Sequence, residues 1–307
     1  MIPAAETFDE TFPFPPHFTA TTGFRMHYVD EGSGPVILCL HGEPTWGYLF
    51  RHVITALAPG HRVVVPDHMG FGKSATPADR SYLLQDHIDN LEALVLELGL
   101  RDITLVMHDF GGPVGMGLAS RHPELIARVV SVNGPTPFGQ PDLLDTLTAN
   151  ASRSPWFRWI AEAHDRDSLR STLGQLGYNI LSTLKLNGFQ NNSIITPTWL
   201  RAYGSPFPTA ADTLGALGWA EGFAQGAHTF ETPSDHAREH LKSCPALAIW
   251  GMADDTLAAD HFLPLFRAAF PNGQVNELPD TGHYSLEDNP ATITALLKLF
   301  LDTTSVS

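Results

Sequence analysis

The stretch ITLVMHDFGG, from Ile103 to Gly112, constrains the fold of this chain more than any other. Its first residues are apolar and include Ile, Thr and Val, which favour a β-strand. A turn closed by Gly111 and Gly112 follows, and residues 113–120 can begin a helix. A strand, a sharp turn and a helix with one reactive side chain at the tip have the layout of a nucleophile elbow. The tip residue is Asp109 rather than serine, so the sequence predicts a carboxylate nucleophile.

Short apolar runs alternate with helical patterns on both sides of this elbow. Such alternation predicts an α/β fold with a doubly wound, mainly parallel sheet. In a sheet of this kind, binding residues gather at the carboxyl ends of the strands. The predicted strands cover residues 24–29, 36–40, 62–66, 103–107, 128–133, 246–250 and 275–278, and the predicted helices cover 46–57, 85–98, 113–120, 261–269 and 291–301.

The alternation stops between residues 135 and 230, where helical patterns dominate and four of the six tryptophans lie. We interpret this segment as an inserted helical cap, and residues 1–134 and 231–307 as an α/β-hydrolase core. Residues 1–20, rich in proline and phenylalanine, are expected to form an extended arm over the surface. The helices expected in the cap cover 142–149, 156–163, 167–184, 197–203 and 210–224.

The composition excludes several classes of partner. The chain has 18 basic and 33 acidic residues and a net charge of −15, so nucleic acid and anionic membranes are poor partners. No run approaches the ~18 apolar residues of a membrane span, and the N-terminus lacks the pattern of a signal peptide. The two cysteines, Cys39 and Cys244, lie in apolar runs and are expected to be core residues. We therefore expect a cytoplasmic protein; its oligomeric state does not follow from the sequence.

Polar residues follow several predicted strands and form a candidate catalytic set. Asp109, Asp254 and His283 occur in the order nucleophile, acid, histidine, which is the order in α/β-hydrolases. Asp109 would attack a carbon atom and become an ester. His283 would then activate water to hydrolyse that ester, and Asp254 would orient the imidazole.

The negative charge that develops in the second step needs hydrogen-bond donors. The backbone N–H groups of Phe110 and Glu43 are expected to form this oxyanion hole. Glu43 lies in the loop HGEPTW, which follows the predicted strand 36–40.

Taken together, these motifs resemble haloalkane dehalogenases over most of residues 24–300. This resemblance implies hydrolysis of a carbon–halogen bond in a small apolar organic substrate to give an alcohol and a halide. Water is the second substrate, and no cofactor or metal is implied. The motifs that carry the resemblance are HGEPTW at 41–46, DHMGFGKS at 67–74, VMHDFGG at 106–112, GMAD at 251–254, DTGH at 280–283 and YGSPFP at 203–208.

One position departs from that family. Haloalkane dehalogenases usually have tryptophan directly after the nucleophile, where its indole N–H helps to hold the halide, whereas this chain has Phe110. The second halide-binding group in the family is either an asparagine at the position of Glu43 or a tryptophan of the cap. The resemblance therefore implies that Trp159 or Trp156 holds the leaving group.

Related activities share the same triad and remain alternatives. Epoxide hydrolases have glycine two residues before the aspartate, where this chain has Met107, although Tyr178 and Tyr203 could supply the two cap tyrosines of that class. Fluoroacetate dehalogenases have arginine where this chain has Phe110, which excludes them. A β-lactone decarboxylase is harder to exclude, because its leaving group is not a halide and the missing tryptophan would matter less. A non-catalytic receptor or binding protein with this fold could also retain the triad.

Overall fold

The computed structural model describes residues 2–304 and contains one eight-stranded sheet with the order β1-β2-β4-β3-β5-β6-β7-β8. β1 pairs antiparallel with β2, and β2 pairs antiparallel with β4, whereas all other neighbours are parallel. The α/β-hydrolase fold expected from the sequence is therefore confirmed. The strands are β1 His17–Thr19, β2 Met26–Glu31, β3 Val36–Leu40, β4 Arg62–Pro66, β5 Ile103–His108, β6 Ile126–Val132, β7 Ala246–Gly251 and β8 Gln274–Leu278.

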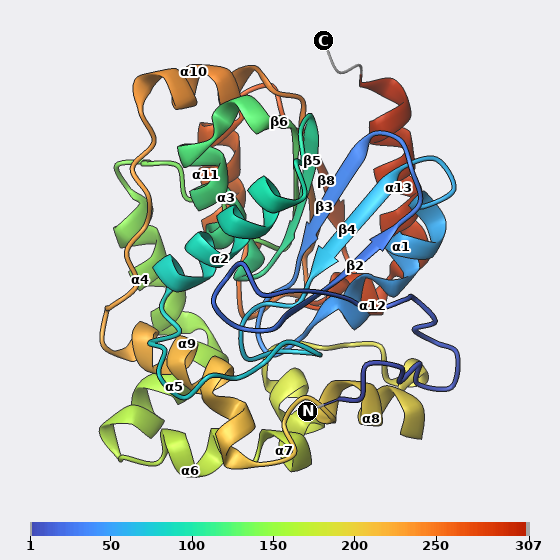
Figure 1. Cartoon of the computed structure of the whole chain (residues 1–307). Coiled ribbons are helices and arrows are strands. Elements are labelled where there is room, and N and C mark those ends of the chain that lie inside the picture. The colour runs from blue at the N-terminus through green and yellow to red at the C-terminus, as the bar shows by residue number, and fades with distance from the viewer. Residues whose placement is uncertain (1, 305–307) are drawn as a thin grey trace.

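The central strands are continuous apolar runs because helices cover both faces of the sheet. Every residue of β5 and of β7 is buried. Figure 1 shows α1 and α13 on one side of the sheet and α2, α3 and α11 on the other. These helices are α1 Arg51–Leu57, α2 Leu84–Glu97, α3 Gly111–Arg121, α11 Ala259–Ala269 and α13 Pro290–Thr303.

A group of helices lies beyond the carboxyl ends of the strands (Figure 1). We propose that residues 135–230, which contain α4 to α9, form the cap, and that residues 1–134 and 231–307 form the core. The cap helices are α4 Leu143–Arg153, α5 Pro155–Asp165, α6 Leu169–Leu173, α7 Leu176–Leu186, α8 Pro197–Gly204 and α9 Leu214–Ala224. The remaining helices are α10 Asp235–Ser243, α12 Ser285–Asp288, and the 3-10 turns η1 Gly47–Phe50, η2 Pro123–Leu125, η3 Asn192–Ile194 and η4 Ala210–Thr213.

Three local predictions differ from the structure. The single helix predicted over 167–184 is two helices, α6 and α7, separated by residues 174–175. The N-terminal arm, expected to be an extended segment over the surface, contributes the short edge strand β1, which was not predicted. α10 was not predicted because it is strongly polar, and Ala237 and Leu241 are its buried residues.

Candidate active site

Asp109 lies at the turn between β5 and α3, with a backbone φ of 49°. This left-handed conformation is tolerated by aspartate better than by bulky residues, and it turns the side chain out of the sheet. Other atoms of the protein lie very close to the glycines around this turn. A Cβ atom on Gly111 would lie 2.3 Å from the carbonyl oxygen of Leu40, and one on Gly42 would lie 2.2 Å from Oδ2 of Asp109. Glycine is therefore required at both positions by close contact.

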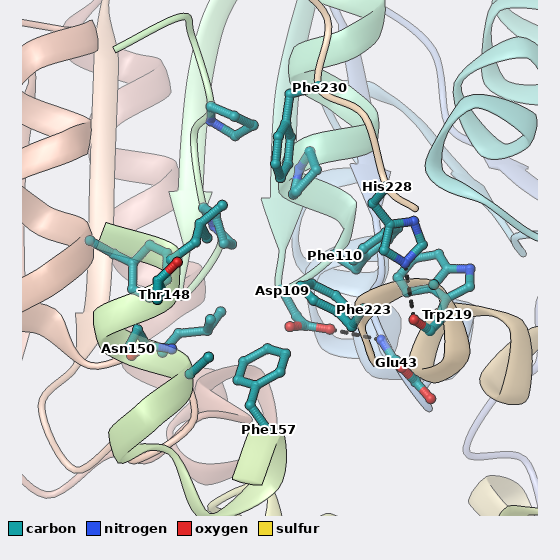
Figure 2. Close-up of a pocket in the computed structure, with 18 of the residues that line it drawn as sticks. Glu43, Asp109, Phe110, Thr148, Asn150, Phe157, Trp219, Phe223, His228 and Phe230 are labelled. Carbon is teal, nitrogen blue, oxygen red and sulfur yellow. Dashed lines mark hydrogen bonds between the residues drawn. The ribbon is translucent and has the colours of Figure 1, made fainter. Parts of the chain in front are cut away.

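The two oxygens of Asp109 have different surroundings. Oδ2 accepts a hydrogen bond of 2.8 Å from the backbone N–H of Glu43, drawn as a dashed line in Figure 2. The backbone N–H of Phe110 also binds this carboxylate. Oδ1 lies 3.5 Å from Nε2 of His283. The structure thus brings both predicted oxyanion-hole groups to the Asp109 carboxylate and the predicted base to its Oδ1 atom.

His283 is held by Asp254, which follows β7. The Nδ1 atom of His283 lies 2.9 Å from Oδ2 of Asp254. The other oxygen of Asp254 accepts hydrogen bonds of 2.8 Å from the backbone N–H groups of Thr256 and Leu257. Because a carboxylate can only accept, Nδ1 of His283 carries the proton and Nε2 faces Asp109. Asp254, and not its exposed neighbour at position 255, therefore orients the imidazole.

The charges of these groups depend on one another. Burial alone would lower the pKa of His283, but Asp254 and Asp109 outweigh it and raise this pKa to about 10. Burial likewise works to raise the pKa of Asp109, yet the close approach and positive charge of His283 bring it below its ordinary value. These opposite shifts both favour the charged forms of Asp109 and His283 when the two groups face each other.

Three supporting residues were missed by the sequence analysis. Asn133 donates from Nδ2 to Oδ2 of Asp254 over 2.8 Å. Nε2 of His108 lies 2.9 Å from the carbonyl oxygen of His283, and the hydroxyl of Tyr284 donates to the carbonyl oxygen of Glu43 over 3.2 Å. His108 and Tyr284 are the sequence neighbours of Asp109 and His283, and Asn133 directly follows β6; these positions are the signals that could have pointed to them.

A cavity of about 290 Å³ lies between Asp109 and the cap. Figure 2 shows Asp109 at its inner wall, with Phe110, Phe223 and His228 on one side and Phe157 facing them from α5. Most of the lining is aromatic or aliphatic, which fits an apolar ligand.

The tryptophans around this cavity differ from the expectation. Trp156 lines it, whereas Trp159 is not among the lining residues and stacks on Trp156 within the cap. Trp219, which the sequence analysis did not single out, also lines the cavity and packs on Phe110 with ring centroids 3.2 Å apart. Its indole N–H donates to Nε2 of His87, so this donor is already engaged.

Glu43 also lines the cavity, beside Asp109. The residue as a whole is 8% exposed, and its Oε1 atom is buried without a hydrogen-bond partner. Burial raises the pKa of this carboxyl well above its ordinary value, and the nearby charge of Asp109 raises it further.

Residues 2–304 contain no group of three or more His, Cys, Asp or Glu side chains placed to hold a metal ion. Over the same residues, no helix is both long and apolar enough to cross a membrane.

Comparison with known proteins places this geometry in a family. The family described as alpha/beta hydrolase fold matches residues 35–290. A cis-3-alkyl-4-alkyloxetan-2-one decarboxylase of Shewanella oneidensis is 34% identical over 303 residues, covering 96% of this chain and 91% of that protein. Haloalkane dehalogenase 2 of Mycobacterium tuberculosis is 29% identical over 297 residues, covering 94% and 95%.

A solved epoxide hydrolase from metagenomes of hot environments has the same fold. The two structures superpose with a TM-score of 0.75 at 23% sequence identity. The superposition covers 95% of this chain and 99% of the epoxide hydrolase chain. The chain therefore belongs to the α/β-hydrolase fold family.

Proposed function

We propose that this enzyme opens a β-lactone through a covalent ester on Asp109 and releases carbon dioxide and an alkene. The main support is the residue beside the nucleophile. Phe110 has no side-chain donor, and the indole N–H of Trp219, which packs on it, is taken by His87. Neither residue offers a free side-chain donor to a leaving halide, so Trp156 is the tryptophan of the cavity wall left to hold one. The relative with 34% identity is named for an oxetan-2-one, which is a four-membered lactone.

The two oxygens of Asp109 suit attack on a saturated carbon. Oδ2 is bound by the backbone N–H of Glu43, which leaves Oδ1 as the nucleophile. Oδ1 would attack ring carbon C4, and the bond from C4 to the ring oxygen would break. That electron pair converts the ring ester into a free carboxylate on C3.

The second step restores the enzyme without water. The C3–carboxylate bond breaks, and its electron pair forms the C3=C4 double bond. Carbon dioxide leaves, and the pair of the C4–Oδ1 bond returns to Asp109. Inversion at C4 followed by anti elimination converts a cis-disubstituted lactone into a cis-alkene, so the geometry of the product reports on the route.

Haloalkane hydrolysis, the first expectation from the sequence, is the second candidate. It is favoured by His283, whose Nε2 lies 3.5 Å from Oδ1 of Asp109, where it could activate water against an ester. The lactone route does not need this step. The same triad therefore supports both reactions, and the leaving group separates them.

Epoxide hydrolysis has less support. Tyr178 is 91% exposed, and the hydroxyl of Tyr203 donates to Glu287. Neither tyrosine is among the residues that line the cavity. Neither is placed to protonate an epoxide oxygen beside Asp109.

The test uses a cis-3,4-dialkyl-oxetan-2-one labelled with carbon-13 at the ring carbonyl. Wild-type enzyme is expected to release labelled carbon dioxide and the cis-alkene, both measured by gas chromatography and mass spectrometry, and Asp109→Asn to release neither. A β-hydroxy acid as the sole enzymatic product, or the trans-alkene, would refute the proposed route.

A parallel experiment tests the second candidate and the binding-protein alternative. His283→Gln is incubated with 1-bromobutane, and the intact mass and free bromide are measured. An alkyl adduct on Asp109 together with bromide release by wild-type enzyme would establish dehalogenation. No turnover of either substrate by any form would favour a non-catalytic protein.

A further inference from the structure

The loop at residues 254–258 determines the direction in which the carboxylate of Asp254 points. Its backbone N–H groups at Thr256 and Leu257 both donate to Oδ1 of Asp254. One partner of the loop lies in the core, where the indole N–H of Trp250 donates to the carbonyl oxygen of Leu257 over 3.1 Å. A displacement of this loop would therefore carry the carboxylate away from the imidazole that it orients.

Asn150 of α4 forms two hydrogen bonds with that loop through its side-chain amide. Nδ2 donates to the carbonyl oxygen of Thr256 over 2.8 Å, and Oδ1 accepts from the backbone N–H of Ala258 over 3.1 Å. An amide suits this position because it offers a donor and an acceptor side by side. Asn150 is 2% exposed, so water competes little for these bonds. The side chain therefore holds the main chain on both sides of Leu257.

A second contact joins the proposed cap to the same loop. The hydroxyl of Thr256 donates over 3.0 Å to the carbonyl oxygen of Asn187, which directly follows α7. Asn150 and Asn187 also line the catalytic cavity, and Figure 2 shows Asn150 on the wall that α4 forms. Cap residues that enclose a ligand thus also hold the loop of the catalytic acid.

A contact at the surface is a weaker alternative for holding α4 against the core. Arg153 of α4 lies 2.9 Å from Asp260 of α11, and their side chains are 60% and 61% exposed. Solvated ion pairs of this kind contribute little to stability. Breaking a buried hydrogen bond costs more, because the groups left behind have no water to bind. The amide of Asn150 is therefore better suited to fix the loop.

We propose that Asn150 is a positioning residue: by holding the loop against the cap, it fixes Asp254 and, through it, His283. The inference rests on the proposed function, in which the electron pair of the C4–Oδ1 bond returns to Asp109 as the alkene is released. Nε2 of His283 lies 3.5 Å from that oxygen. A displaced imidazole would stabilise the returning charge less well, because charge interactions weaken with distance.

The first test observes the site without substrate. The Nδ1 proton of His283, which binds Asp254, is followed by proton NMR and is assigned by its absence from the spectrum of His283→Gln. Asn150→Leu has a similar volume but lacks both hydrogen bonds, so this proton should exchange with water about 10–100-fold faster. Asn192→Leu changes an exposed asparagine of η3 in the same way and should behave as wild type.

A second pair of variants tests the other cap contact by the same measurement. Thr256→Val keeps the shape of the side chain but removes the hydroxyl that binds the carbonyl oxygen of Asn187. It should also speed the exchange of the His283 proton, and Thr256→Ser, which keeps the hydroxyl, should retain slow exchange. Equal exchange in Thr256→Val and Thr256→Ser would show that the cap does not act through this loop.

Kinetics separate positioning from the two simpler roles of Asn150. With the labelled lactone, Asn150→Leu should lower kcat about 10–100-fold and change KM little, as expected when a reacting group is misplaced from a distance. Thermal unfolding establishes that each variant is folded at the assay temperature.

Two results would overturn the proposal. A lower melting temperature with unchanged kcat and unchanged exchange of the His283 proton would show that Asn150 only stabilises the fold. A raised KM with unchanged exchange would show that Asn150 acts on the ligand directly. Absence of lactone turnover by wild-type enzyme would instead refute the proposed function, and the exchange measurement would still decide the role of Asn150.

Discussion

The ion pair between His283 and its two carboxylates predicts an unusual loss of stability at alkaline pH. The folded chain holds the His283 proton with a pKa of about 10, against an ordinary value of 6.5. Below pH 6.5 both folded and unfolded chains hold this proton, and the full stabilisation is present. Between pH 6.5 and 10 only the folded chain holds it, so the stabilisation decreases as the pH rises. At about 1.4 kcal/mol per pH unit, the total effect is about 5 kcal/mol.

The measurement is guanidinium unfolding of wild type and His283→Gln at pH 6.5 and pH 10, followed by tryptophan fluorescence. We expect wild type to lose about 4 kcal/mol more of its free energy of unfolding than the variant between these pH values, because the histidine is half-titrated in the unfolded chain at the lower pH and in the folded chain at the higher one. His236→Gln, which changes an exposed histidine of α10, should behave as wild type. Equal losses in wild type and His283→Gln would show that His283 is not protonated in the folded chain.

Three further predictions follow from contacts around the site. Phe110→Trp should lower the free energy of unfolding by about 1–3 kcal/mol, because the ring of Phe110 is tightly packed against Trp219. The same variant should raise bromide release from 1-bromobutane if the missing indole donor limits dehalogenation, and an unchanged release would remove that explanation. Asp254→Asn should lower the pKa of His283, measured by NMR titration of the imidazole, because a raising charge is lost. Glu287→Gln should cost about 3–5 kcal/mol in urea unfolding, since it leaves the buried guanidinium of Arg51 without its partner.

The sheet was predictable because its central strands carry their own signal. Val36–Leu40 and Ala246–Gly251 are continuous apolar runs, as expected for strands covered on both faces. β1 could not be predicted, since its three residues pair at the edge of the sheet and do not alternate in polarity clearly. α10 is strongly polar and buries little, so a search for apolar periodicity passes over it.

The catalytic set could be proposed because Asp109 and Asp254 each follow a strand, and the carboxyl ends of parallel strands meet at one edge. The tryptophans could not be ranked in this way. Whether Trp156, Trp159 or Trp219 reaches the cavity depends on how the cap helices pack on the core, and sequence periodicity does not determine that packing. The hydrogen bond from the Trp219 indole to His87 joins the cap to α2. It likewise cannot be predicted from the sequence, because it depends on how the cap packs on the core.

The two neighbouring carboxyls of the site are distinguished by where the positive charge lies. His283 approaches Asp109 to 3.5 Å, and the backbone N–H of Glu43 donates to the same carboxylate. Both contacts favour the charge on Asp109, and that charge in turn favours a neutral Glu43. In the proposed reaction, ester formation would remove the charge of Asp109, one of the two charges that raise the pKa of His283, so this pKa would fall at that stage. His283 could then release its proton to solvent and act as a base, so hydrolysis would compete with loss of carbon dioxide only after the ester exists.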